Sequence, residues 1–229
     1  ITSSFEHHAV LNSCASIEQR GFPVIYIDPN EYGQILPETL NSHIRKDTRL
    51  VSIMFVNNEI GTIQPIKELS DIAHQQGALF HTDAVQAIGH ISIDVHELGV
   101  DLLSASAHKF NGPKGIGFLY IRRGLVIPPF SDGGAQEKGL RAGTENVASI
   151  VGMAAALKNN CSKLFEIQRH IRCLETRLLS KLTASGIAAL RNGGTCTLPG
   201  LLSLSFPGKD GDVILHRMDL MGISISTGA

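Results

Sequence analysis

The sequence lacks a strong charge of either sign. Its 20 Lys and Arg residues nearly balance 21 Asp and Glu residues, and the formal net charge is −1. Proteins that bind nucleic acid or an anionic membrane surface usually show a basic excess or a basic patch. We therefore expect neither a directly bound nucleic acid nor a membrane among the partners of this protein.

Long apolar runs are missing too. No stretch approaches the roughly 18 apolar residues of a transmembrane helix, and no signal peptide is recognisable. With 43% hydrophobic and 18% charged residues in 229, the composition is that of an ordinary globular protein. Because the chain begins at Ile1 and stops at Ala229 in mid-pattern, we expect it to be a fragment that lacks both termini.

Cysteine is scarce. The four cysteines, Cys14, Cys161, Cys173 and Cys196, form no C-x-x-C pair, and their spacing fits no zinc framework. His7 and His8 are adjacent, which argues against a shared metal, because neighbouring strand residues point to opposite faces. We predict no metal site, and reduced thiols in a cytoplasmic compartment.

What is present is an alternation of two kinds of segment. Amphipathic stretches at 10–20, 37–44 and 65–76 have helical spacing. Between and after them lie short apolar runs that predict buried strands at 24–27, 50–55, 78–81, 102–105 and 115–121. Such alternation predicts an α/β fold with a mostly parallel sheet.

The second half of the chain has a different sequence pattern. Residues 125–146 are rich in Gly and Pro and predict an irregular loop, and a long helical pattern follows over 144–181. A strand at 201–206, a helix at 212–220 and a short strand at 223–226 come next. We predict a larger domain over 1–165, incomplete at its N-terminus, and a smaller, incomplete domain over 166–229.

Polar side chains follow the predicted strands at the point where each strand ends. In open α/β sheets ligands bind outside the carboxyl ends of the strands. The topology therefore aims one group of side chains at one crevice: His7, His8, Asn57, Asn58, Asp83, Gln86, Ser106, His108 and Lys109. Taken singly, each fits a capping residue or a surface charge. Neither a nucleotide P-loop nor a G-x-G-x-x-G turn is present.

Five segments in order resemble one family over essentially the whole chain. They read EHHAVLNSC, VNNEIGTIQPI, FHTDAVQAIG, SASAHKFNGPKGIGFLYIRRG and LRAGTEN, and they are similar to the NifS/IscS-type cysteine desulfurases of the class V aminotransferase family. The resemblance implies a fold-type I enzyme that depends on pyridoxal 5'-phosphate (PLP). It implies a mostly parallel, mixed sheet between helices, with part of a smaller α+β domain.

The resemblance also implies a role for each matching residue. Lys109 matches the lysine that bonds covalently to PLP, and His7 matches the imidazole that stacks on the cofactor ring and shuttles a proton. Asp83 matches the carboxylate that pairs with the ring nitrogen. Contacts near the ring hydroxyl are implied for Asn58 and Gln86, contacts with the cofactor phosphate for Ser106 and His108, and a contact with the neighbouring subunit's phosphate for Thr144.

The implied reaction removes sulfur from L-cysteine and leaves L-alanine. The sulfur would stay on the enzyme as a persulfide and pass to an iron–sulfur or thiolation acceptor protein, and the match at Thr144 implies a homodimer. The family's reactive cysteine follows a stretch that matches 226–229, so we expect it beyond Ala229 and expect these 229 residues alone to be inactive. Selenocysteine lyase, cysteine sulfinate desulfinase and a non-catalytic truncated scaffold remain open as alternatives.

Overall fold

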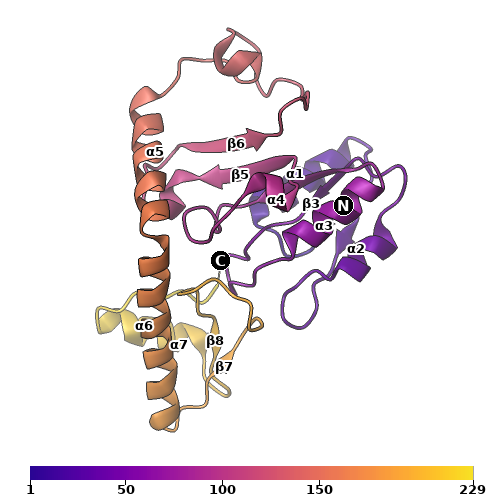
Figure 1. Cartoon of the computed structure of the whole chain (residues 1–229). Helices are drawn as coiled ribbons and strands as arrows, with labels where there is room; N and C mark the ends of the chain where they lie inside the picture. Colours follow the sequence, from indigo (N-terminus) through magenta and orange to yellow (C-terminus); the bar gives the residue numbers. More distant parts are fainter. Residues whose placement is uncertain (229) are drawn as a thin grey trace.

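The computed structural model describes residues 1–228 and has the α/β architecture that the sequence predicts (Figure 1). Its main sheet has six strands in the order β2-β1-β3-β4-β5-β6. These are β1 (Thr2–Ser3), β2 (Tyr26–Ile27), β3 (Leu50–Ser52), β4 (Leu79–Asp83), β5 (Leu102–Ser106) and β6 (Gly117–Ile121). All neighbours are parallel except β5 and β6, which form an antiparallel pair, so the sheet is mixed.

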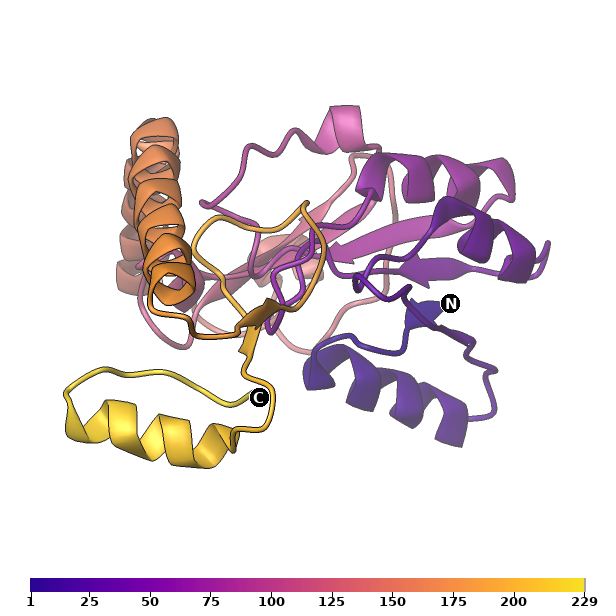
Figure 2. The same ribbon diagram turned by 90° about the horizontal axis from the view of Figure 1, so that it is seen from below.

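Helices cover both faces of this sheet. They are α1 (His8–Gln19), α2 (Pro37–His43), α3 (Ile66–Gln75) and α4 (Val95–Leu98). Figure 2 shows α1 on the opposite side of the sheet from α3. One residue from each of three strands, Val51, Phe80 and Leu103, is completely or almost completely buried in the core. Leu69 of α3 and Leu40 of α2 are buried there too.

Local signals set the helix boundaries close to the predicted ones. Pro37 occupies the first turn of α2, where its missing N–H is not needed. Gly77 follows α3 with a φ of +75°, a left-handed conformation that glycine adopts without a steric penalty. The chain can therefore turn from α3 directly into β4.

The long helical pattern at 144–181 is two helices rather than one. Helix α5 (Val147–Ser162) ends at Lys163, whose φ of −113° and ψ of 9° are not helical, and α6 (Leu164–Ala184) begins directly after it. In Figure 1 the two helices form one column, in which α5 lies beside β5 and β6 and α6 extends beyond the main sheet. The domain boundary near 165 remains a prediction.

The last part of the chain forms a small antiparallel pair, β7 (Leu190–Arg191) with β8 (Leu204–Ser205), and helix α7 (Gly211–Leu220). The predicted strand at 223–226 is wrong. Ile223 and Ile225 alternate like strand residues, but both are more than 40% exposed, and no strand pairs with them in the described part of the chain. Without a ladder of hydrogen bonds the alternation alone does not make a strand. Among residues 1–228, no helix is both long and apolar enough to cross a membrane.

Candidate functional site

Four neighbouring parallel strands, β1, β3, β4 and β5, have their carboxyl ends on the same side of the sheet, which we call the carboxyl edge. The last residues of these strands and the turns that follow them carry every predicted site residue except Thr144, namely His7, Asn58, Asp83, Gln86, Ser106, His108 and Lys109. The topology thus gathers at one edge side chains that lie up to about a hundred residues apart in the sequence. Their catalytic and cofactor-binding roles remain predictions.

His7 lies in the turn between β1 and α1 and caps the helix. Its Nδ1 accepts a hydrogen bond from the backbone N–H of Ala9 at 3.1 Å, and its carbonyl accepts one from Val10 at 2.8 Å. Because Nδ1 is an acceptor, a neutral His7 carries its ring proton on Nε2. The ring is exposed, so capping leaves its Nε2–H edge free for another contact. His8 is the first residue of α1 and is not on a strand.

Asp83 is the last residue of β4. Its Oδ1 accepts a hydrogen bond from the N–H of Val85 at 2.9 Å, which starts the turn that carries Gln86. Its other oxygen accepts no hydrogen bond within the described residues. One carboxylate oxygen therefore shapes the turn and the other is available to a cationic partner.

Lys109 lies in η1 (Ala107–Phe110), a 3₁₀ turn directly after β5. Ala107 and Phe110 are fully buried and anchor the turn, while His108 and Lys109 are exposed. The carbonyl of Lys109 accepts a hydrogen bond from His90 Nε2 at 2.7 Å. The buried neighbours and the hydrogen bond from His90 thus hold the backbone of this turn, and the side chain of Lys109 is left at the surface.

Ser106 and His108 form a polar pair beside Lys109. Ser106 Oγ and His108 Nδ1 are 2.8 Å apart. A hydroxyl and an imidazole at this distance can both donate to an anionic oxygen when the imidazole is charged, and phosphate oxygens are strong acceptors. This pair has the donor chemistry of a phosphate contact.

Asn57 holds the turn that presents Asn58. Its Oδ1 accepts from the N–H groups of Glu59 and Ile60, both at 2.9 Å, and its Nδ2 donates to the carbonyl of Phe5 at 3.2 Å. Asn57 is 3% exposed. It therefore has a supporting role, fixing the loop after β3 against the loop that leads to His7, and Asn58 is the partly exposed member of the pair.

Thr144 is the one predicted residue that the structure does not bring to this edge. It is exposed in the loop between β6 and α5, which Figure 1 shows extending away from the body of the sheet. No hydrogen bond of the described residues joins its side chain to the other site residues.

The sequence reasoning missed His81, which lies two residues before Asp83 on the same face of β4. Its Nδ1 is 2.8 Å from Ser52 Oγ in β3, and its Nε2 is 2.9 Å from Ser104 Oγ in β5. Burial lowers the pKa of His81, and this outweighs the raising effect of the Asp83 charge. The neutral imidazole of His81 thus links β3, β4 and β5 two residues before Asp83.

Replacing His81 by phenylalanine should destabilise the fold. The ring volume is roughly kept, but the hydroxyl groups of Ser52 and Ser104 lose their partner in a partly buried position. We expect a loss of about 1–3 kcal/mol in the free energy of unfolding, measured by urea denaturation. Ser104→Ala removes one hydroxyl together with its bond, so it should lose less than His81→Phe; an equal or larger loss would contradict the bridging role.

The donor set fits PLP. This cofactor presents a pyridine nitrogen, a ring hydroxyl, an aldehyde and a phosphate. The edge offers a carboxylate at Asp83, amides at Asn58 and Gln86, an amine at Lys109, and the Ser106–His108 pair. Each chemical group of the cofactor thus has a matching partner among these residues. Within residues 1–228, no group of three or more His, Cys, Asp and Glu side chains is arranged to hold a metal ion.

Known proteins resemble this chain along its whole length. The aminotransferase class-V family model matches residues 1–229. Two curated relatives, both described as cysteine desulfurase IscS, are 48% identical: one from Methanosarcina thermophila over 229 residues and one from Dictyoglomus turgidum over 237. The alignments cover all of this chain, which spans only 57% and 58% of those two proteins.

Solved structures show the same fold. A NifS-like protein superimposes with a TM-score of 0.94 at 41% identity, covering 99% of this chain and 62% of its own. A structure described as SspA in complex with cysteine has a TM-score of 0.82 at 35% identity, covering 100% of this chain and 63% of its own. The predicted fold, a mixed and mostly parallel sheet of the PLP-enzyme type, is thereby confirmed.

Proposed function

The chain belongs to the aminotransferase class-V family, and from that premise we propose that it is the central part of a PLP-dependent cysteine desulfurase. The observation that carries the proposal is the gathering of Lys109, Asp83 and the Ser106–His108 pair at the carboxyl ends of the neighbouring parallel strands β4 and β5. The names of the relatives support the substrate, since the curated proteins are cysteine desulfurases and one solved structure holds cysteine.

Each residue of the edge has a distinct task in this proposal. The free oxygen of Asp83 would pair with the ring nitrogen, and the Ser106–His108 pair would hold the phosphate. When bound, PLP would supply an electron sink for the carbon next to the substrate amine. Lys109 would hold the cofactor covalently and its amine would move the proton at that carbon, while the exposed His7, with Nδ1 engaged in the helix cap, would be a second proton carrier through Nε2.

The desulfuration step itself needs a nucleophile for sulfur. A thiolate attacks the substrate Sγ, and the new S–S bond forms as the Cβ–Sγ bond breaks. The electron pair of the broken bond stays with the carbon, which takes up a proton and becomes the methyl group of alanine. The sulfur remains as a persulfide, which we propose is passed to an iron–sulfur or thiolation acceptor protein.

A cleft of about 790 Å³ reaches one residue of this edge, Asn58. It lies between the turn that carries Asn58 and the region of β8 and α7, and Asn58 is the predicted site residue that lines it. An amide at the cleft wall can hydrogen-bond a substrate carboxylate. We propose that cysteine enters along this cleft with its carboxylate toward Asn58.

We further propose a homodimer in which the loop of Thr144 contacts the phosphate of the neighbouring subunit. The support is the exposed position of Thr144 in the loop between β6 and α5. The four cysteines form no disulfide within the described residues, which is compatible with our proposal of a reducing, cytoplasmic location.

The reaction is tested with a longer protein that contains this sequence and is loaded with PLP. We expect stoichiometric alanine and persulfide, or sulfide in the presence of a reducing thiol, when L-cysteine is supplied. Selenocysteine and cysteine sulfinate are run in parallel to separate the related lyase and desulfinase activities. PLP binding without alanine formation from cysteine would overturn the proposal.

A further inference from the structure

A buried carboxyl group lies at the base of the turn that presents His7. Glu6 is 5% exposed, and its Oε1 accepts two hydrogen bonds, from Ser3 Oγ at 2.7 Å and from the N–H of Met54 at 2.8 Å. Ser3 ends β1 and Met54 follows β3. Glu6 thus ties the turn before α1 to the neighbouring strand, and this attachment fixes where His7 can lie.

The other oxygen of Glu6 has no partner. Oε2 is buried and accepts no hydrogen bond within residues 1–228. The titratable group whose charge acts on Glu6 is Asp83 of β4, which is an acid, and the charge of Glu6 in turn raises the pKa of the Cys14 thiol in α1. A carboxylate in this position would be a buried anion with no cation beside it, which is strongly unfavourable.

Protonation removes the buried charge and keeps both hydrogen bonds. Burial raises the pKa of Glu6 to about 7, the negative charge of Asp83 adds to the rise, and the bonds from Met54 and Ser3 oppose it. In the acid form Oε1 remains a carbonyl-type acceptor for both donors, and the proton lies on Oε2.

We propose that Glu6 is a positioning residue for His7 and works as an uncharged carboxylic acid, fastening the His7 turn without placing a second negative charge next to Asp83. The cofactor side of this inference rests on the proposed function, since Asp83 then stays the single anion available to the ring nitrogen. The attachment of the turn and the proton on Glu6 do not depend on it.

Three variants test the proposal. Glu6→Gln keeps the shape and an acceptor oxygen but has no charge, Glu6→Ala removes the attachment, and Glu38→Gln neutralises an exposed carboxylate of α2 as a matched control. The first readout is the nitrogen NMR signal of His7. We expect the Nε2–H form in the parent chain and in Glu6→Gln, and a mixture of tautomers in Glu6→Ala, because the helix cap is released.

The pH dependence of stability supplies a readout that a purely structural role would not change. Unfolded glutamate has a pKa of about 4.3, so between that pH and about 7 the folded chain holds a proton that the unfolded chain has lost. The contribution of Glu6 to stability should therefore fall as pH rises through this window and level off above it. Glu6→Gln should abolish this fall, and Glu38→Gln should keep it.

Infrared spectroscopy provides the direct check. At pH 6 we expect a carboxylic-acid carbonyl band that is missing in Glu6→Gln and present in Glu38→Gln. If that band is absent from the parent chain, or if Glu6→Gln disturbs His7 as much as Glu6→Ala does, the proposal is wrong. These readouts need no cofactor, so a failure of PLP binding would count against the proposed function and leave the test of Glu6 intact.

Discussion

Replacing Lys109 by alanine will abolish the covalent attachment of PLP. Lys109 is exposed in a turn whose backbone is held by buried Ala107 and Phe110, so loss of its amine should leave the fold unchanged. The visible absorbance band of lysine-bound PLP should disappear. In the longer protein, alanine formation from cysteine should fall by at least about 10³-fold, because both the covalent link and a proton carrier are lost.

The matched control is Lys181→Ala, which removes an exposed lysine at the end of α6. It should retain the absorbance band and the activity. An unchanged band in Lys109→Ala would show that another lysine holds the cofactor. Circular dichroism of both variants confirms that they fold.

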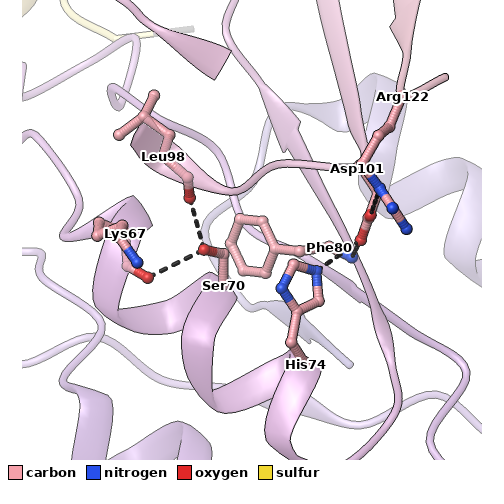
Figure 3. Close-up of polar contacts among 7 residues, drawn as sticks. All are labelled: Lys67, Ser70, His74, Phe80, Leu98, Asp101 and Arg122. Atoms are coloured by element: carbon pink, nitrogen blue, oxygen red, sulfur yellow. Dashed lines mark hydrogen bonds and ion pairs between the residues drawn. The ribbon is translucent and has the colours of Figure 1, made fainter. Parts of the chain in front are cut away.

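Replacing Asp101 by alanine should produce the largest loss of stability. Asp101 is fully buried just before β5. Its Oδ1 accepts from Arg122 Nε at 2.6 Å, and its Oδ2 accepts from the N–H of Phe80 at 2.7 Å and from His74 Nε2 at 2.8 Å (Figure 3). The truncation leaves these donors without their acceptor. We expect a loss of about 3–5 kcal/mol in the free energy of unfolding, measured by urea denaturation.

The same carboxylate predicts the behaviour in acid. Burial by itself would raise the pKa of Asp101, but the hydrogen bonds from Phe80, His74 and Arg122 outweigh it and lower the pKa below its usual value. The unfolded chain therefore takes up this proton at a higher pH than the folded chain. The stabilisation is complete above about pH 4 and is lost as pH falls through the lowered pKa, and Asp101→Ala should lack this part of the acid dependence.

An exposed ion pair serves as the control for Asp101. Arg45 and Asp47 are 3.1 Å apart, with side chains that are 59% and 70% exposed. Asp47→Ala should therefore lose no more than about 0.5 kcal/mol. Similar losses for Asp47→Ala and Asp101→Ala would contradict the assignment of Asp101 as a buried structural centre.

The sheet could be predicted from the sequence because its strands are short and largely apolar. Segments such as 50–55 and 102–105 are mainly apolar, and polar residues follow closely where they end. The topology rule then sufficed to place Asp83 and Lys109 at one edge. The local sequence did not give the exact strand lengths. The strand predicted at 50–55 ends at Ser52, and the strand predicted at 78–81 continues to Asp83.

The supporting residues could not be predicted in the same way. The contact of His81 with Ser52 spans 29 positions, and the contact of Glu6 with Met54 spans 48. Both depend on which strands become neighbours and in which register, and a local pattern does not contain this information. The alternation of His81 and Asp83 along β4 is the one local signal that could have placed them on the same face.

The identity of the residue that holds the cofactor tests the central claim most directly. The protein is loaded with PLP, the link is reduced with borohydride, and the peptides are analysed by mass spectrometry. We predict the pyridoxyl group on the peptide that contains Lys109, at that residue. A pyridoxyl group on a different lysine, or none after loading, would contradict the account.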